Sequence, residues 1–430
     1  MGLYFKSITR AFLVIVFSVV LSACSTIPSL MPTPAVYLDQ PFDENQVPEQ
    51  LQIPGAEIFY ITDRAVEDVP STQDDSDKKK INYGSRRSAS LAYGNAAVRF
   101  KNKNIDWDAL LRASNEAKRT KRFKYTLDHV EELGRFPASP YQFIRTENGI
   151  ELTPEVSSQR NEEINKFHNQ LRERLSQTQL KDVILYVHGF SNTFEKAAFT
   201  MAGLWHFFQR QGVPIIYSWP AGRGGLTGYF TDRESGEFTI FHLKETIRFL
   251  SAMPDINNIH IIAHSRGTDV TTSALRELVI ENRAAGINPR VSLKIKNLVM
   301  AAPDLDFEVI QQRLMAEQFG PAIGNITIYT SRQDKALRLS QYIMSGLRFG
   351  RVASSDIELN ERKVFAAAGN VDFIQVPKSR RFLGHSYFHS NPAVSADLIQ
   401  LIRKDATPGS NERNLLSLGD NFWQIEEPKK

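Results

Sequence analysis

The chain has 430 residues, of which 42% are hydrophobic and 23% are charged, and its formal net charge at pH 7 is +4. This composition is typical of a globular protein, and the length exceeds that of one small domain, so one large domain with additions is expected. The charge is small for this length and the basic residues do not gather into one stripe, which argues against nucleic-acid binding.

The amino terminus carries an export signal. Lys6 and Arg10 precede the apolar run "AFLVIVFSVVLSA" (11–23), which is too short for a stable membrane-spanning helix but fits the centre of a signal peptide. The run ends in "LSAC" (21–24), which resembles the lipobox of bacterial lipoproteins, in which the Cys is lipidated. Residues 1–23 are therefore predicted to be a lipoprotein signal peptide, with Cys24 as the palmitate-bearing residue; the alternative is a leftover Cys in an ordinary signal or a short anchor.

Cys24 is the only cysteine, so the chain cannot form an internal disulfide. Lipidation would attach the protein to a membrane almost permanently, because several acyl chains bind far more strongly than one. The residue after Cys24 is Ser25 rather than Asp. By its resemblance to Gram-negative lipoproteins, this implies that the protein is sorted to the outer membrane. The expected location is the cell envelope, with the protein facing the periplasm.

The segment from residue 24 to 54 is rich in Pro and polar residues and shows no sustained period, so it is predicted to be a disordered tether. At Ala56 the pattern changes to the strand-like "AEIFYITDR", which opens a domain predicted over 55–405. Residues 65–180 are interpreted as an insertion, with a solvated charged loop expected at 70–80, a strand at 90–100 and a charged helix at 155–179. Residues 406–430 are predicted to be a tail.

After Lys181, apolar runs of strand length alternate with amphipathic helices. The strand runs include "DVILYVHGF", "GVPIIYSWP", "NIHIIAHS", "LKIKNLVMAAP", "NITIYTS" and "VDFIQVP". Strands that are apolar throughout are typical of a parallel sheet covered on both faces. The predicted fold class is therefore α/β, with a mostly parallel sheet and helices on both sides.

Ser265 follows one of these runs, in "IIAHSRGTDV", directly before a predicted helix. Reactive residues gather at the carboxyl ends of such strands, and a nucleophilic Ser on a strand-to-helix turn requires small residues two positions before and after it. These positions hold Ala263 and Gly267, so the first Gly of the usual G-x-S-x-G is replaced by Ala. The alternative is a Ser that caps a helix in a non-hydrolytic domain.

Acyl transfer also requires oxyanion donors and a base. The turn in "YVHGF" follows an earlier strand, and the expected donors are the N–H groups of Phe190 and Arg266. The alternative is that this HG pair marks no oxyanion turn and that His188 is only a buried structural residue. The base is expected after the last strand, where His385 in the Gly-hinged "GHSYF" is favoured over His389, which approaches the start of a helix.

Two carboxylates compete for the role of orienting acid. Asp334 lies a few residues past a strand in "NITIYTSRQDKAL", the usual place for the acid in this chain order. Asp304 follows the preceding strand in "NLVMAAPDLD", where a turn or helix cap is the simpler interpretation, as for its neighbour Asp306. Asp334 is therefore the favoured acid.

Taken together, the motifs resemble the bacterial α/β-hydrolase family catalogued as domain of unknown function nine hundred. The resemblance rests on "FYITDR", "LYVHGFSNTFEKA", "YSWPAGRGGLTGYFTDRES", "IIAHSRGTDV", "APDLD", "YTSRQDKALRLS" and "GHSYF". It implies the α/β-hydrolase fold, with Ser265 as nucleophile, an Asp after a late strand and His385 as base. It names no substrate.

Four further residues could shape a substrate pocket: Trp219 and Tyr229 as aromatic walls, and Arg223 or Arg233 as partners of an anionic group. The simpler interpretation makes Trp219 a core residue and the arginines solvated or paired. No phosphate-binding glycine loop and no metal-binding His pattern is present, so no cofactor and no metal is expected.

The sequence therefore predicts a membrane-anchored serine hydrolase, most simply a carboxylic-ester hydrolase acting on a small-molecule or lipid ester. The competing hypothesis is an envelope lipoprotein that keeps the fold but has lost catalysis and acts as a binding or scaffold protein.

Overall fold

One large sheet organises the described residues, which are 28–67, 81–147, 149–377 and 384–426 of the computed structural model. Within them the sheet has 11 strands in the spatial order β12-β13-β11-β10-β9-β8-β6-β7-β1-β2-β3. Its strands are β1 (Gly55–Val66), β2 (Tyr83–Phe100), β3 (Tyr125–Arg135), β6 (Asp182–Val187), β7 (Val213–Ser218), β8 (Asn258–His264), β9 (Ile295–Ala301), β10 (Asn325–Thr330), β11 (Val371–Gln375), β12 (Leu415–Ser417) and β13 (Phe422–Ile425).

The strand directions confirm the predicted fold class. Every neighbouring pair from β1 through β7, β6, β8, β9, β10 and β11 to β13 is parallel. Only β2, β3 and β12 run antiparallel to their neighbours. Because both faces of the central strands are covered, β6, β7, β8, β9 and β10 are buried at nearly every position rather than at every second one.

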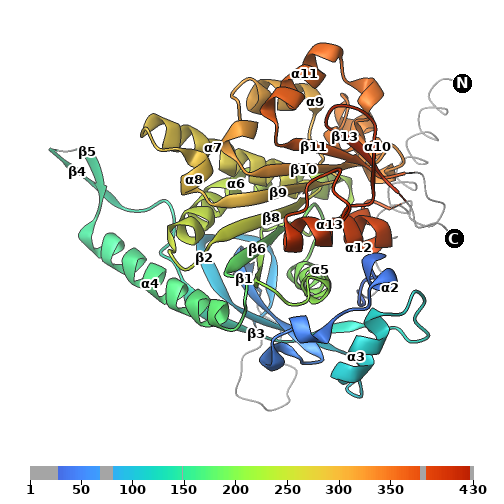
Figure 1. Ribbon diagram of the computed structural model, residues 1–430. Helices are drawn as coiled ribbons and strands as arrows, with labels where there is room; N and C mark the ends of the chain where they lie inside the picture. The colour runs from blue at the N-terminus through green and yellow to red at the C-terminus, as the bar shows by residue number, and fades with distance from the viewer. Residues whose placement is uncertain (1–27, 68–80, 148, 378–383, 427–430) are drawn as a thin grey trace, which may run out of the picture.

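Helices cover both faces of the sheet (Figure 1). One layer contains α2 (Val36–Asp39), α3 (Trp107–Ser114), α5 (Phe194–Phe207), α12 (Tyr387–Ser390) and α13 (Pro392–Lys404). The other contains α4 (Pro154–Ser176), α6 (Gly225–Ala252), α7 (Gly267–Ala284), α9 (Phe307–Ile310) and α11 (Leu359–Ala368). The short helices α8 (Pro289–Ser292) and α10 (Lys335–Met344) lie in the connections before β9 and after β10.

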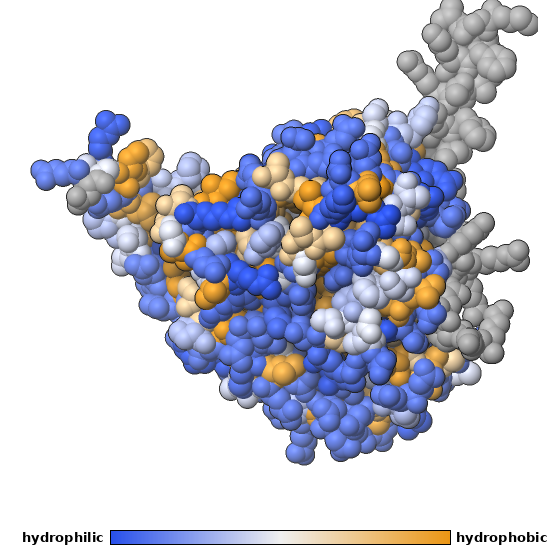
Figure 2. Space-filling view, turned by 45° about the horizontal axis from the view of Figure 1, so that its top comes forward, coloured by the Kyte–Doolittle hydropathy of each residue, from blue (hydrophilic) through white to orange (hydrophobic). Residues whose placement is uncertain are grey.

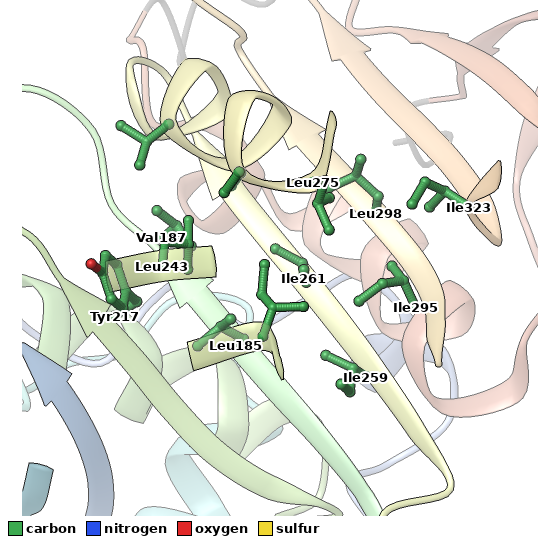
Figure 3. Close-up of a cluster of buried hydrophobic side chains, with 14 of the residues drawn as sticks. Leu185, Val187, Tyr217, Leu243, Ile259, Ile261, Leu275, Ile295, Leu298 and Ile323 are labelled. Carbon is green, nitrogen blue, oxygen red and sulfur yellow. The ribbon is translucent and has the colours of Figure 1, made fainter. Parts of the chain in front are cut away.

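Each face of the sheet has its own hydrophobic core. Because side chains alternate along a strand, Ile259 and Ile261 of β8 belong to one core and Ile262 to the other. Figure 3 shows the first of these cores, with Leu275 of α7 packed over Ile261 and Leu298. This packing fixes the carboxyl ends of β8 and β9, where the candidate site lies.

The helix boundaries follow capping signals in the sequence. The Thr153 side chain accepts a hydrogen bond from the Val156 N–H at the start of α4, and Pro154 occupies the first helical position. The Asn391 side chain caps α13 in the same way, again followed by Pro, and Arg403 and Lys404 occupy the last turn. These signals delimit the helix that the sequence predicted at 155–179 and the last helix of the domain, whose apolar pattern in the sequence begins near residue 394.

The predicted tether over 24–54 is wrong for its described part, residues 28–54. Leu30, Tyr37, Phe42 and Val47 are buried in the core beneath α5, although they follow no period. The Tyr37 hydroxyl donates a hydrogen bond of 2.6 Å to the carbonyl oxygen of Phe207 at the end of α5. Scattered apolar residues can anchor an irregular segment on an existing surface, and a periodicity argument does not detect this kind of packing.

The insertion predicted over about 65–180 is also wrong in part, because β2 and β3 extend the main sheet beyond β1. Of the first eight residues of β2 only Tyr83 is buried and the others are exposed or partly buried, so this part lacks the continuous apolar pattern of a central strand. The predicted strand at 90–100 is the inner half of β2, and the predicted charged helix is α4. The tail predicted at 406–430 likewise contains β12 and β13, with Phe422 stacked on Phe373 of β11 at 4.6 Å.

Part of the 65–180 region does project from the body. The hairpin of β4 (Phe143–Thr146) and β5 (Gly149–Leu152) extends from one end of α4 (Figure 1). Phe143 and Ile150 are 64% and 67% exposed on it. Figure 2 shows hydrophobic surface near the tip of this arm, while hydrophilic side chains dominate the rest of the visible face.

The predicted signal peptide and Cys24 lie outside the described residues. Across the described part of the chain, no helix combines the length and the apolar character needed to cross a membrane.

Candidate active site

Ser265 occupies a strained turn between β8 and α7. Its φ angle is 53°, in the left-handed region that residues other than Gly rarely adopt, and only 5% of the residue is exposed. Its N–H donates a 2.9 Å hydrogen bond to the carbonyl oxygen of Ala301 at the end of β9. Its own carbonyl oxygen accepts a 2.6 Å hydrogen bond from the Thr268 hydroxyl. Hydrogen bonds on both sides of the residue therefore maintain the strained conformation.

Small neighbours make this turn possible. A Cβ atom on Gly267 would lie 2.4 Å from the carbonyl oxygen of His188, and one on Gly189 would lie 2.8 Å from the Cβ of Ser265. Neither contact is sterically allowed, so both positions require Gly. Ala263, which replaces the first Gly of the usual pattern, is completely buried in the core. Its extra methyl group is thus accommodated without opening the turn.

His385 and Asp334, predicted as base and acid, form a direct pair. The Nδ1 atom of His385 lies 2.7 Å from Oδ2 of Asp334. The other carboxylate oxygen of Asp334 accepts a 2.9 Å hydrogen bond from the Leu337 N–H at the start of α10, which fixes the carboxylate. Asp334 is 1% exposed, whereas the His385 side chain is 22% exposed. The pair therefore has a buried acid and an accessible imidazole.

The environment of His385 favours its protonated form. Burial lowers its pKa, but the charge and hydrogen bond of Asp334 and the charge of Asp304 outweigh burial, so the pKa is raised above its ordinary value. With Nδ1 directed at Asp334, Nε2 is the nitrogen left to accept a proton from another group.

His264 connects this pair to the Ser265 turn, a contact that sequence reasoning missed. Its Nε2 atom lies 3.1 Å from the carbonyl oxygen of His385, and the two rings are 4.7 Å apart. Burial, followed by the charge of His385, holds the pKa of His264 well below its ordinary value. A neutral His264 with its proton on Nε2 donates to that carbonyl. Ser265, His385 and Asp334 are thereby brought to one end of the sheet.

The Ser265 Oγ atom makes no hydrogen bond to another described residue. Such contacts are commonly long or poorly aligned without substrate and tighten when substrate binds.

His389, the alternative base, is placed differently. It lies in α12 with its ring against Phe388, and it pairs with no carboxylate of the described chain. Burial lowers its pKa to about 4. A His that stays neutral and lacks an acidic partner is a poorer candidate for the base than His385.

The alternative acid, Asp304, has other partners. Its carboxylate accepts hydrogen bonds from the Ser340 hydroxyl at 2.6 Å and from the Tyr229 hydroxyl at 3.1 Å, and Arg348 lies 4.0 Å away. The backbone N–H of Asp304 donates to the carbonyl oxygen of Ser265 at 3.4 Å. Asp304 thus supports the Ser265 turn and contributes charge near His385, while a direct histidine contact belongs to Asp334. Its neighbour Asp306 caps α9.

The two expected oxyanion donors are free. Among the described residues, neither the Phe190 N–H nor the Arg266 N–H donates a hydrogen bond to another protein group. Arg266 directly follows Ser265, and Phe190 follows Gly189, which packs against the Ser265 Cβ. Stabilisation of a developing oxyanion requires donors of this kind, which are not already paired with another protein group.

Arg64, from the "FYITDR" run, positions the loop that carries Phe190. Its guanidinium donates to the carbonyl oxygens of Asn192 at 2.8 Å and Ala221 at 2.6 Å, and Nη2 lies 3.2 Å from Nε2 of His188. Burial and then the charge of Arg64 lower the pKa of His188 to about 3, so His188 is neutral and accepts this bond. The sequence placed Arg64 in a motif but gave it no role, because its partners are distant in the chain.

Asp232 reinforces the same loop. One of its carboxylate oxygens accepts hydrogen bonds from the N–H groups of Ser191 at 3.1 Å and Gly222 at 3.2 Å. Burial raises the pKa of Asp232, and these backbone hydrogen bonds partly oppose that effect. The Phe190 turn is therefore attached to the end of β7 through both Arg64 and Asp232.

The residues considered for a substrate pocket divide into two kinds. Trp219 is completely buried, donates from Nε1 to the carbonyl oxygen of His188 at 2.7 Å and stacks on the His188 ring. Tyr229 is also buried; its hydroxyl donates to Asp304, and its ring packs edge-on against Phe190 with the ring centroids 5.4 Å apart. Arg223 and Arg233 are exposed. Tyr229 alone of these four contacts both an expected oxyanion residue and the Ser265 support.

A second Ser-His-Asp chain of hydrogen bonds lies elsewhere. The Ser139 hydroxyl is 3.1 Å from Nε2 of His242, and Nδ1 of His242 is 2.9 Å from Oδ2 of Asp63. Ser139, however, is not in a strained strand-to-helix turn, and its hydroxyl also contacts the carbonyl oxygen of Ala89 at 3.2 Å. This chain connects the loop before β4 to α6 and provides a natural control for experiments on Ser265.

No cluster of three or more His, Cys, Asp or Glu side chains suited to a metal ion occurs in the described ranges.

Solved structures give only distant likenesses. An uncharacterized protein from Bacillus cereus has 12% sequence identity and a TM-score of 0.33, and the match covers 59% of this chain and 71% of that one. A fungal esterase from Rhizomucor miehei has 13% identity and a TM-score of 0.29, covering 53% and 74% of the two chains. A lipase-esterase related protein from Clostridium acetobutylicum has 10% identity and a TM-score of 0.19, covering 46% and 74%. These likenesses are too weak to support a functional argument.

No curated protein matches the chain. A family model does: the alpha/beta hydrolase of unknown function (DUF900) matches residues 163–404, which is more than half of the sequence and runs from within α4 to the end of α13. The chain therefore belongs to this family of alpha/beta hydrolases.

Proposed function

We propose that this protein is a serine hydrolase that cleaves carboxylic esters, with Ser265 as nucleophile, His385 as general base and Asp334 as orienting acid. One observation carries the proposal. The buried Asp334 carboxylate binds Nδ1 of His385, and the His385 backbone binds the residue that precedes the strained Ser265. The three groups follow one another in the chain order expected after the strands of this fold.

The reaction would proceed through an acyl-enzyme. Ser265 Oγ attacks the ester carbonyl while its proton passes to Nε2 of His385, and the carbonyl oxygen becomes an oxyanion facing the N–H groups of Phe190 and Arg266. The imidazolium then gives its proton to the departing alcohol. Water attacks the acyl-enzyme by the same route, again with His385 as base, and releases the carboxylic acid.

The first test is turnover of a p-nitrophenyl ester series by the purified protein. Ser265→Ala should abolish turnover, while Ser139→Ala should leave it unchanged, because the hydrogen bonds of Ser139 go to Ala89 and His242 and to no residue of the proposed site. If no ester of any acyl length is hydrolysed, or if Ser265→Ala hydrolyses at the wild-type rate, the enzyme proposal fails. The competing hypothesis of an inactive binding or scaffold lipoprotein would then be favoured.

We further propose that the protein is anchored through a lipid on Cys24 in the outer membrane, facing the periplasm, which makes lipid or envelope esters attractive substrates. The proposal rests on the "LSAC" sequence. The carbonyl oxygen of Pro28 accepts a 2.9 Å hydrogen bond from the Tyr125 N–H of β3, so the chain is already bound to the body at that residue. Four residues span at most roughly 14 Å, so an anchor at Cys24 would keep the body close to the leaflet.

This second proposal has its own test. Cys24→Ala should abolish incorporation of labelled palmitate and retain the signal peptide on the precursor. Label that persists in the Cys24→Ala protein would refute lipidation at this residue, without affecting the enzyme proposal.

A further inference from the structure

An apolar cavity lies on the face of the sheet opposite α5. It has a volume of about 280 Å³ and lies between the strands β9, β10 and β11 on one side and the helical segments 307–321 and α11 on the other. Its floor is formed by Met300, Ile328 and Val371, and its roof includes Phe319 and Phe365. Since Ser265 binds the backbone of Ala301 and none of the lining residues, the cavity is a separate feature from the proposed active site.

The side chains that line the cavity offer water too few hydrogen-bond partners. Gln318 is the one lining residue with a polar side chain, and none of the lining residues carries a charge. An ordered water requires two to four polar partners, whereas an engineered apolar cavity of about 150 Å³ stays dry and takes up apolar molecules. Protein interiors are otherwise packed with few voids larger than a water molecule. A cavity of this size with this lining is therefore suited to an apolar ligand.

The wall of the cavity departs from regular helix where it meets that space. Residues Gln311–Met315 form a π-helical turn, a rare geometry that occurs frequently at functional sites. Leu314 and Met315 from this turn both line the cavity. Met315 and Met300 face it with unbranched side chains that adapt to ligands of irregular shape.

The cavity also reaches solvent. Val364 of α11 lines it and is nevertheless 49% exposed, so an apolar chain can enter beside α11 while a polar head group stays in water. The volume is just below the range of about 300–1,000 Å³ that is usual for small-molecule sites, which fits one aliphatic chain rather than a ring system with polar substituents.

We propose that this cavity binds a single unbranched aliphatic chain, such as that of a fatty acid, with its carboxylate at the mouth beside α11. The site does not depend on the proposed hydrolase reaction. It adds a lipid-binding function on the side of the sheet that carries α7 and α11.

Calorimetric titration with hexanoate, octanoate, decanoate and dodecanoate tests the proposal. Saturable binding should strengthen with chain length until the cavity is filled, and Ser265→Ala should bind like the wild type. Ala368→Phe introduces a ring at a lining position and should weaken binding by about tenfold or more. The matched control is Ala366→Phe, at an exposed position of the same helix that does not line the cavity, and it should bind normally.

Absence of saturable binding by the wild type would overturn the proposal, as would equal binding by Ala368→Phe and the wild type. If Ala368→Phe does not fold, a photoreactive diazirine fatty acid on the wild-type protein decides the question. Cross-links mapped by mass spectrometry to peptides covering 310–321 or 364–371 support the cavity, and cross-links found only elsewhere contradict it. If the wild-type protein binds these fatty acids but hydrolyses no ester, only the proposed hydrolase function is refuted.

Discussion

The imidazole of His385 and the carboxylate of Asp334 are 2.7 Å apart, although 51 residues separate them in the chain. Asp334 is completely surrounded by protein and also caps α10, so its orientation does not depend on substrate. A carboxylate in this position fixes the tautomer of the histidine and stabilises the imidazolium that forms during acyl transfer.

Replacing Asp334 by Asn should therefore lower kcat by about four orders of magnitude, because an amide can hold the imidazole in the wrong tautomer. The fold should survive, since an Asn side chain still caps α10. Asp304→Asn is the matched control: it should mainly reduce thermal stability, because Asp304 binds Ser340 and Tyr229 rather than the histidine. Steady-state kinetics with thermal unfolding of both variants checks this. An active, folded Asp334→Asn protein beside an inactive, folded Asp304→Asn protein would reverse the assignment.

The acid limb of the pH profile of kcat/KM should have its midpoint above the ordinary pKa of a histidine. His385 must be neutral to accept the serine proton, and its environment raises its pKa, so activity should rise as pH increases through that raised pKa. Asp334→Asn removes the main cause of the increase and should move the limb of the residual activity to lower pH. A wild-type limb near pH 4 would instead indicate His389, whose pKa is lowered to about 4.

A methyl group on Gly267 should disrupt the Ser265 turn. The new Cβ would lie 2.4 Å from the carbonyl oxygen of His188, a backbone atom that cannot move without shifting the Phe190 loop. Gly267→Ala should cost about 1–3 kcal/mol in the free energy of unfolding and should remove most of the activity. Gly236→Ala in α6 is the control, because a Cβ there has an ordinary 3.4 Å contact with Val270 and Ala favours helix. Urea unfolding of both variants measures the difference; equal stability would argue against this steric account.

Arg64 should act as a positioning residue for the oxyanion donor of Phe190. Lys in its place carries one ammonium group and cannot bind the carbonyl oxygens of Asn192 and Ala221 together with His188. Arg64→Lys should therefore lower kcat by about 10²-fold, comparable to the loss of one oxyanion donor, with a smaller change in KM. The exposed Arg223 supplies the control, since Arg223→Lys should change neither constant. An Arg64→Lys protein that is stable and has wild-type kcat would show that this guanidinium does not position the loop.

The parts of the fold that sequence could predict are those with both faces buried. The apolar run of β8 ends at His264, and the strand, Ser265 and α7 follow one another locally, so the turn was predictable from the sequence. The order of Ser265, Asp334 and His385 was predictable for a related reason, because each lies in the connection that follows an apolar strand. The strand β2 was not predicted as part of the main sheet because its first eight residues, Tyr83 apart, are exposed or only partly buried.

Other features depend on contacts between distant segments. Tyr37 is anchored by the carbonyl oxygen of Phe207, 170 residues away, so local composition predicted a tether where the chain is packed. Arg64 also depends on distant partners, which come from β2 at Gly84 and from the loops near residues 192 and 221. Buried polar residues whose partners are backbone carbonyls leave no periodic pattern in the sequence.

The most direct test of the central claim is to locate the adduct after treatment with a fluorophosphonate. Peptide mass spectrometry of the treated protein should find the phosphonyl group on Ser265, and none on Ser139, although the Ser139 hydroxyl contacts a histidine. Labelling should disappear in Ser265→Ala and fall sharply in Asp334→Asn. If the treated protein remains folded and carries no adduct on Ser265, the assignment of Ser265 as the nucleophile is contradicted. An adduct on Ser139 in place of Ser265 would contradict it as well.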